Sequence, residues 1–335
     1  VNNKSDSFLP EEKRFIEAIV GLIVEFLNGR KALQIIETSN EKGEEEDSLD
    51  ADSVHITTQQ LLQKFLDRHN SERNLFHELM PFKVKEILLV ANLYDAYIIE
   101  GEGRFSDHIL GEYNQMNLTT MPRVTGVASQ QEALKRLREK HFDLIIIMVG
   151  VDKASALKFE EKIVKDYPYI PTNLLLNNSR DIAAIREESN LSVLPENLFI
   201  WNGDSKVFFT MVKLLEDWVN VENDTKLGVT KIILLIEDSP IFYSKYLSIL
   251  YSLVLEQTKH LIEDVGSEDL YKVIKLRARP KIIHVRTYNK AIEIIDQFGD
   301  DLLCVISDIR FPVDNVLVEN AGFELIREVK SKFEN

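Results

Sequence analysis

The chain has 335 residues, of which 40 are Lys or Arg and 55 are Asp or Glu, and its formal net charge is -15. This length predicts at least two domains, and 44% hydrophobic with 28% charged residues excludes wholesale disorder. The acidic balance argues against nucleic acid or an anionic membrane as the main partner, because both attract positive surfaces. The single cysteine, Cys304, cannot form an intramolecular disulfide, which fits a reducing, cytoplasmic location.

The N-terminal part of the chain predicts helices joined by an acidic tether. Apolar residues recur at helical spacing between residues 15 and 27, a stretch too short and too acidic to insert in a membrane or to act as an export signal. We assign residues 1–40 to this helix, which resembles the closing helix of a GAF-type sensor domain. Residues 41–56 form an acidic linker and residues 57–82 a second helical segment. Because the chain begins at Val1, we expect a fragment of a longer protein.

From residue 83 onward the sequence predicts an α/β fold that is built twice. Short runs rich in Ile, Val and Leu alternate with amphipathic stretches, which is typical of parallel strands covered by helices. The run at 87–90 (ILLV) corresponds to the run at 233–236 (ILLI). A second correspondence keeps a constant offset of 158 residues, beginning with Pro122 and Pro280. We therefore predict two doubly wound parallel-sheet domains.

The two copies differ in completeness. The first, at 83–225, contains five predicted strands, with the fourth near 173–176, the fifth near 198–201 and a last helix from about 205 to 219. The second, at 229–335, ends inside its third helix and lacks two of those strands. We therefore expect an exposed edge on the second sheet.

Three acidic residues follow the first and third strands of the second copy. Glu237 and Asp238 come directly after the run at 233–236, and Asp308 follows the run that contains Cys304, which we expect to be buried. Carboxyl ends of neighbouring parallel strands face one crevice, so the three carboxylates can converge there. Because they repel each other unless a cation joins them, the sequence predicts a Mg²⁺ site. A carboxylate beside that ion can attack phosphorus.

The segment 231–335 resembles the receiver domain of response regulators in two-component signalling, on the runs IILLIEDSP and VISDIRFP. The resemblance implies a flavodoxin-like fold and a phosphoacceptor signalling domain, rather than an enzyme, whose partner is a histidine kinase or a phosphotransfer protein. It implies that Asp308 is the phosphoacceptor. The Mg²⁺ ligands that it implies are Glu237, Asp238, Asp308 and the backbone carbonyl of Arg310.

The second copy also departs from an ordinary receiver. Pro312 and Gly322 match the turn after the acceptor, but Asp238 and Asp308 are 70 residues apart, and the excess predicts a helical insertion at about 255–279. We expect the basic cluster in this region either to be a solvated helix face or to dock an acidic partner segment. Its members are Lys272, Lys275, Arg277, Arg279 and Lys281. The chain also stops before the Thr or Ser and the Lys with which a receiver holds the phosphoryl group, so we expect poor phosphorylation.

The first copy resembles a receiver in architecture but not in chemistry. Ala91 and Asn92 take the place of the acidic pair, and the acceptor position falls on Met148 or Gly150, depending on whether one gap is allowed. Asp152, the nearest acid, lies beyond the expected strand end. We therefore predict a pseudo-receiver used for packing, for dimerisation through helices, or for relay of a conformational signal.

Two other functions remain open from the residues alone. A phosphatase of the haloacid-dehalogenase type also places a nucleophilic Asp after a strand beside Mg²⁺, but Arg310 stands where its acid/base Asp belongs. The second alternative is a purely structural scaffold in which neither copy is phosphorylated. The tandem arrangement also resembles the regulatory region of bacterial proteins related to phosphoenolpyruvate synthase and pyruvate phosphate dikinase, which would place any catalytic part outside this chain.

Overall fold

The computed structural model describes the ranges 78–91, 121–189, 195, 197–201, 206–227, 230–263, 277–314 and 316–333. The predictions for the N-terminal helix, the acidic linker, most of 57–82 and the centre of the insertion lie outside these ranges. Both sheets belong to one compact unit formed by residues 80–252 and 280–335, and the account below concerns this unit. Among the described helices, none is long and apolar enough to cross a membrane.

Strands and helices alternate along the chain, which confirms the predicted α/β character. The first half contains β1 (Glu86–Val90), β2 (Arg123–Val127), α7 (Gln130–Glu139), β3 (Leu144–Val149), α8 (Lys153–Asp166), β4 (Thr172–Leu176), α9 (Asp181–Ser189), β5 (Leu198–Ile200) and α10 (Lys206–Lys226). The second half contains β6 (Ile232–Ile236), α11 (Pro240–Glu263), β7 (Lys281–Val285), α13 (Tyr288–Phe298), the 3-10 helix η1 (Gly299–Asp301), β8 (Leu302–Ser307), β9 (Phe311–Val313), β10 (Val316–Val318) and α14 (Ala321–Phe333).

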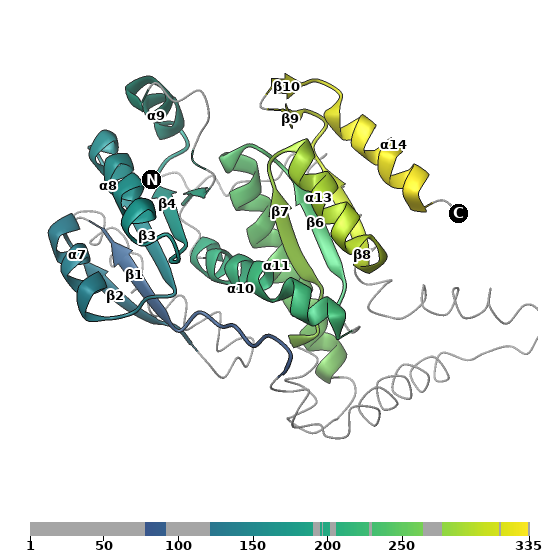
Figure 1. Cartoon of the computed structure of the whole chain (residues 1–335), viewed down its shortest axis with the longest axis horizontal. Helices are drawn as coiled ribbons and strands as arrows, with labels where there is room; N and C mark the ends of the chain where they lie inside the picture. Colours follow the sequence, from purple (N-terminus) through teal and green to yellow (C-terminus); the bar gives the residue numbers. More distant parts are fainter. Residues whose placement is uncertain are drawn as a thin grey trace, which may run out of the picture. The chain divides into compact units, whose positions relative to one another are not determined.

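The two parallel sheets repeat one pattern of strand pairing. The first has the order β2-β1-β3-β4-β5 and the second the order β7-β6-β8, so each places its first strand between its second and third (Figure 1). Val90 pairs with Val127 in the first sheet, as Ile236 pairs with Val285 in the second. The constant offset in the sequence therefore corresponds to a repeated register of the backbone.

Helices cover the sheets because the strands are apolar on both faces. All six residues of β3 are buried, as expected of a central parallel strand. Figure 1 shows α7 and α8 beside the first sheet, where Leu137 and Ile163 join its core. In the second sheet, Ile295 of α13 and Leu325 of α14 pack in the same cluster as the β6 residues.

Each half covers an edge of the other half's sheet. Helix α10 of the first half packs against β7, where a side-chain oxygen of Asp217 accepts a hydrogen bond from the backbone nitrogen of Ile282 at 3.0 Å. Reciprocally, the Ser244 hydroxyl of α11 accepts a hydrogen bond from the backbone nitrogen of Ile200, at the edge strand β5, also at 3.0 Å. These contacts satisfy backbone groups that an open edge would expose, so the two halves build one folded unit.

A buried ionic cluster reinforces this junction and corrects one prediction. Lys281, expected on a solvated helix face or at a docking site, is the first residue of β7 and is 0% exposed. Its Nζ lies 2.8 Å from Oδ2 of Asp224 and 3.9 Å from Oδ1 of Asp217, both on α10 and both fully buried. A buried lysine is tolerated here because carboxylates from the other half compensate its charge.

Candidate functional site

The three predicted carboxylates come together at one edge of the second sheet. Glu237 and Asp238 follow β6, and Asp308 follows the neighbouring strand β8, where its backbone nitrogen donates to the carbonyl of Ile236 at 2.9 Å. One carboxylate oxygen from each of the three residues lies within 4.8 Å of the others. Within the described ranges, this is the only group of three acidic or metal-ligating side chains arranged closely enough to hold an ion.

Burial and the neighbouring carboxylates raise the pKa values of two members of this cluster. Burial raises the pKa of Glu237 to about 7, the hydrogen bond from the backbone nitrogen of Ser239 (3.0 Å) opposes that rise, and the charges of Asp308 and Asp238 add to it. Burial also raises the pKa of Asp238, partly offset by its own backbone N–H and by the positive charge of Arg286. A divalent cation would relieve both effects.

The backbone around Asp308 orients its side chain. Oδ1 of Asp308 accepts a hydrogen bond from the backbone nitrogen of Ile309 at 2.7 Å, and the Ser307 hydroxyl donates to the Asp308 carbonyl at 2.7 Å. The first turn of α14 lies against this segment, because the backbone nitrogen of Gly322 donates to the Ile309 carbonyl at 2.9 Å. A Cβ on Gly322 would lie 2.1 Å from the Asp308 carbonyl oxygen, so this close approach requires glycine.

Between Asp308 and α14 the structure contains a β-hairpin that was not predicted from the sequence. Pro312, matched to a turn after the acceptor, lies in β9 and pairs with Leu317 of the antiparallel strand β10. The Arg310 side chain extends toward Glu319, with Nη1 and Oε1 separated by 3.6 Å. The assignment of the Arg310 carbonyl as a metal ligand stays a prediction.

A second layer of residues behind the acidic cluster was not identified from the sequence. Nε2 of His284, on β7, lies 2.9 Å from the backbone carbonyl of Glu237, and because a carbonyl only accepts, this nitrogen carries the proton. Burial lowers the pKa of His284 to about 4, so the ring is neutral at pH 7. The Tyr243 ring centroid lies 4.5 Å from that of His284. The only feature of the sequence that could have indicated this residue is its position, because His284 is a polar residue within the predominantly apolar strand KIIHV.

The same sheet edge in the first half has apolar residues in place of the carboxylates. The Ala91 nitrogen donates to the Val127 carbonyl at 3.0 Å, as the Glu237 nitrogen donates to the Val285 carbonyl at 3.1 Å, so Ala91 and Glu237 are equivalent. Asn92 lies outside the described residues.

The strand register also decides which residue of the first half corresponds to the acceptor. Val90 pairs with Ile147 and Ile236 with Ser307, so Met148 is equivalent to Asp308 and Gly150 is not. The pairing of β8 also shifts by one residue between Ile232 and Ile233. Asp152, considered as a substitute acceptor, caps α8 instead, since its Oδ1 accepts from the Ser155 nitrogen at 2.9 Å.

No family model, curated protein or solved structure matches this chain. The functional argument therefore rests on its own residues and their geometry.

Proposed function

We propose that the second half, residues 229–335, is a receiver-type phosphoacceptor module in which Asp308 accepts a phosphoryl group with the help of Mg²⁺. The observation that carries this proposal is the convergence of Glu237, Asp238 and Asp308 at the ends of neighbouring parallel strands. The strand order supports it, because the five-stranded sheet has the flavodoxin-like order and the second sheet repeats its first three positions. The phosphodonor would be a histidine kinase or a phosphotransfer protein.

The donor set fits Mg²⁺. This ion prefers hard oxygen ligands, and the three carboxylates would supply them. The three carboxylate oxygens lie within 4.8 Å of one another, so small side-chain adjustments would let Glu237, Asp238 and Asp308 share one ion. When bound, the ion would neutralise charge on the phosphoryl group during transfer.

The remaining steps of phosphoryl transfer are assigned to residues of the chain. Oδ1 of Asp308 is held by the Ile309 nitrogen, which leaves Oδ2 to attack phosphorus. A new bond forms between Oδ2 and phosphorus, and the bond between phosphorus and the donor's leaving atom breaks. The bonding electrons remain with the leaving group, which takes up a proton, and nothing is oxidised or reduced. Asp308 is suited to the role of acceptor because it lies at the solvent-exposed end of the cluster, whereas Glu237 is buried.

The first half is proposed to be a scaffold that is not phosphorylated. Ala91 and Met148, each 5% exposed, occupy the positions of Glu237 and Asp308. Neither side chain can bind Mg²⁺ or attack phosphorus. Its proposed contribution is the packing of α10 and β5 against the second half.

The proposal is tested by incubating the chain with Mg²⁺ and either acetyl phosphate or beryllofluoride. We expect one Mg²⁺-dependent phosphoryl adduct by intact mass, localised to Asp308 by peptide mapping, and shifts of the Asp308 and Ile309 amide signals with beryllofluoride. Asp308→Asn should abolish the adduct, whereas Asp300→Asn, at an exposed aspartate in η1, should retain it. The absence of a Mg²⁺-dependent adduct on Asp308 would contradict the proposal. Turnover of a phosphomonoester that depends on Asp308 would favour the phosphatase instead.

A further inference from the structure

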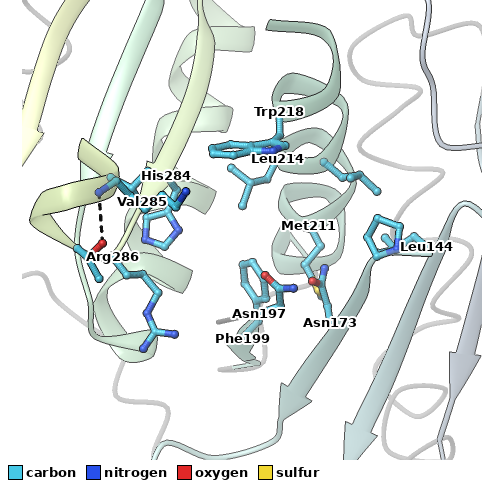
Figure 2. A pocket seen from close by; sticks show the side chains of 14 residues that line it. Leu144, Asn173, Asn197, Phe199, Met211, Leu214, Trp218, His284, Val285 and Arg286 are labelled. Carbon is cyan, nitrogen blue, oxygen red and sulfur yellow. Dashed lines mark hydrogen bonds between the residues drawn. The ribbon is translucent and has the colours of Figure 1, made fainter. Parts of the chain in front are cut away.

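A cavity of about 400 Å³ lies between the two sheets and is separate from the acidic cluster (Figure 2). It is bounded by the amino ends of β3 and β4, by one face of α10, and by the carboxyl end of β7 with the start of α13. Glu237, Asp238 and Asp308 do not line it. Its size is within the range of about 300 to 1,000 Å³ that is typical of small-molecule sites.

One wall of the cavity is apolar and partly aromatic. Phe199 of β5 and Met211, Leu214 and Trp218 of α10 face the space in Figure 2. Phe199 and Met211 are buried, whereas Trp218 is 46% exposed. This exposure places Trp218 at the rim, where its indole ring can cover the apolar body of a ligand.

The remaining lining is polar and carries only positive formal charge. Arg286 and Lys290 contribute cationic groups, Asn173 and Asn197 contribute amides, and no Asp or Glu lines the cavity. Asn173 is itself only 8% exposed, although it lies in a strand of otherwise apolar or small residues. The lining therefore favours a ligand that combines an apolar body with a negatively charged group.

Both cations also have partners within the protein. Nη1 of Arg286 donates to the Pro195 carbonyl at 2.8 Å, and the positive charge of Arg286 also acts on Asp238. Nζ of Lys290 lies 2.7 Å from Oε2 of Glu293, but both side chains are about 60% exposed, so this pair is weak and exchangeable. A carboxylate in the cavity would be attracted by the positive charge of these two side chains in addition to their present partners.

We propose that this cavity is a binding site for a small aromatic carboxylate, with the ring against Trp218 and the α10 side chains and the carboxylate toward Arg286 and Lys290. The proposal does not depend on phosphorylation of Asp308. It assigns a ligand site to the junction of the two halves, where binding would involve residues of both.

The test is a titration of the chain with 2-naphthoate, followed by the quenching of Trp218 fluorescence and by calorimetry. A Trp218→Phe variant separates the signal of Trp218 from that of the buried Trp201. We expect saturable binding at one site, and at least tenfold weaker binding of the neutral analogue 2-naphthamide. Lys290→Met should weaken 2-naphthoate binding several-fold. Lys135→Met, at an exposed lysine of α7 that does not line the cavity, should not.

A Leu214→Trp variant should fill the cavity and abolish calorimetric binding, with its fold checked by circular dichroism. If that variant does not fold, the exposed Lys290→Met variant and the amide analogue still decide the question. The proposal is overturned if 2-naphthoate does not saturate at millimolar concentration, or if the amide binds equally well. It is also overturned if Lys290→Met and Lys135→Met behave alike. Asp308→Asn should bind 2-naphthoate like the wild type, so failure of this proposal is distinguishable from failure of the phosphoacceptor proposal.

Discussion

The carboxyl ends of the two sheets have the same backbone and different chemistry. In both halves the residue after the first strand donates a backbone hydrogen bond to the end of the second strand, at 3.0 Å from Ala91 and 3.1 Å from Glu237. In the first half, Ala91 and Met148 close this edge with buried apolar side chains. In the second, Glu237 and Asp308 form an acidic crevice. The pairing of parallel strands thus brings the residues at the strand ends close together, and the side chains at those ends decide whether the edge can bind a cation.

The third strands of the two sheets differ in a related way. Strand β3 lies between β1 and β4 and is buried throughout. Within the described ranges, β8 pairs only with β6, and most of its residues are half-buried. Cys304, expected to be buried, is therefore half-buried as well. Burial of a parallel strand depends on its neighbours and not only on its own apolar sequence.

Exchange of the equivalent residues Met148 and Asp308 should reveal the largest difference in stability between the two sheet edges. Met148→Asp would bury a carboxylate without a partner, and we expect it to lower the free energy of unfolding by about 4 kcal/mol. Asp308→Met removes one of three repelling charges and should be neutral or stabilising. Urea denaturation of both variants at pH 7 measures the two effects. Equal losses in the two variants would show that the two edges do not differ as described.

The junction between the halves is tested by Lys281→Met. The substitution leaves Asp224 and Asp217 buried without their cation, so we expect a loss of about 3 kcal/mol in the free energy of unfolding. Lys231→Met is a matched control, because the ion pair of Lys231 with Asp301 is partly exposed and should contribute less than about 1 kcal/mol. Similar urea midpoints for the two variants would contradict the importance of the buried cluster.

A pair of glycine substitutions compares local packing in the two halves. Gly322→Ala places a Cβ against the Asp308 carbonyl, and we expect it to cost about 2 kcal/mol and to weaken Mg²⁺ binding. Gly126→Ala, in β2, meets nothing within 4 Å and should be neutral or stabilising by up to about 1 kcal/mol. Thermal unfolding and Mg²⁺ titration by NMR measure both effects. Unchanged Mg²⁺ affinity in Gly322→Ala would show that α14 does not position Asp308.

The pH dependence of stability should report on Glu237. Its pKa is raised to about 7 in the folded state, so the folded chain binds more protons than the unfolded chain between about pH 4.5 and pH 7. Stability should therefore fall as pH rises through this window, by roughly 3 kcal/mol. Glu237→Gln should flatten the profile, and saturating Mg²⁺ should stabilise the wild type more at pH 8 than at pH 6. A profile identical to that of Glu237→Gln would exclude the raised pKa.

The sequence was sufficient to predict the strands of the two parallel sheets and the acidic cluster. Buried parallel strands are continuous apolar runs, so the runs at 87–90 and 233–236 are visible without a structure. Because strand ends share an edge, residues directly after those runs could be predicted to meet. The side chains of Glu237, Asp238 and Asp308 do meet.

Features that depend on the partner of a polar side chain could not be predicted. The last helix of the first half was expected to end near 219 but continues to Lys226, because Asn220 and Asp224 are buried and accept hydrogen bonds from the backbone nitrogens of Phe82 and Met80. A polar residue in a helical pattern is expected to face solvent, so the burial of Asn220, Asp224 and Lys281 could not be predicted from the hydrophobic periodicity.

The α/β alternation, the duplication and the three carboxylates after the strands could thus be predicted from the sequence, because apolar runs and the residues that follow them are local properties of the chain. Only the tertiary structure decided that α10 and α11 join the two halves, that Met148 is the equivalent of Asp308, and that a cavity with a cationic edge lies between the sheets. Each of these depends on which distant strands pair or which distant side chains pack together, and no local pattern in the sequence specifies those partners.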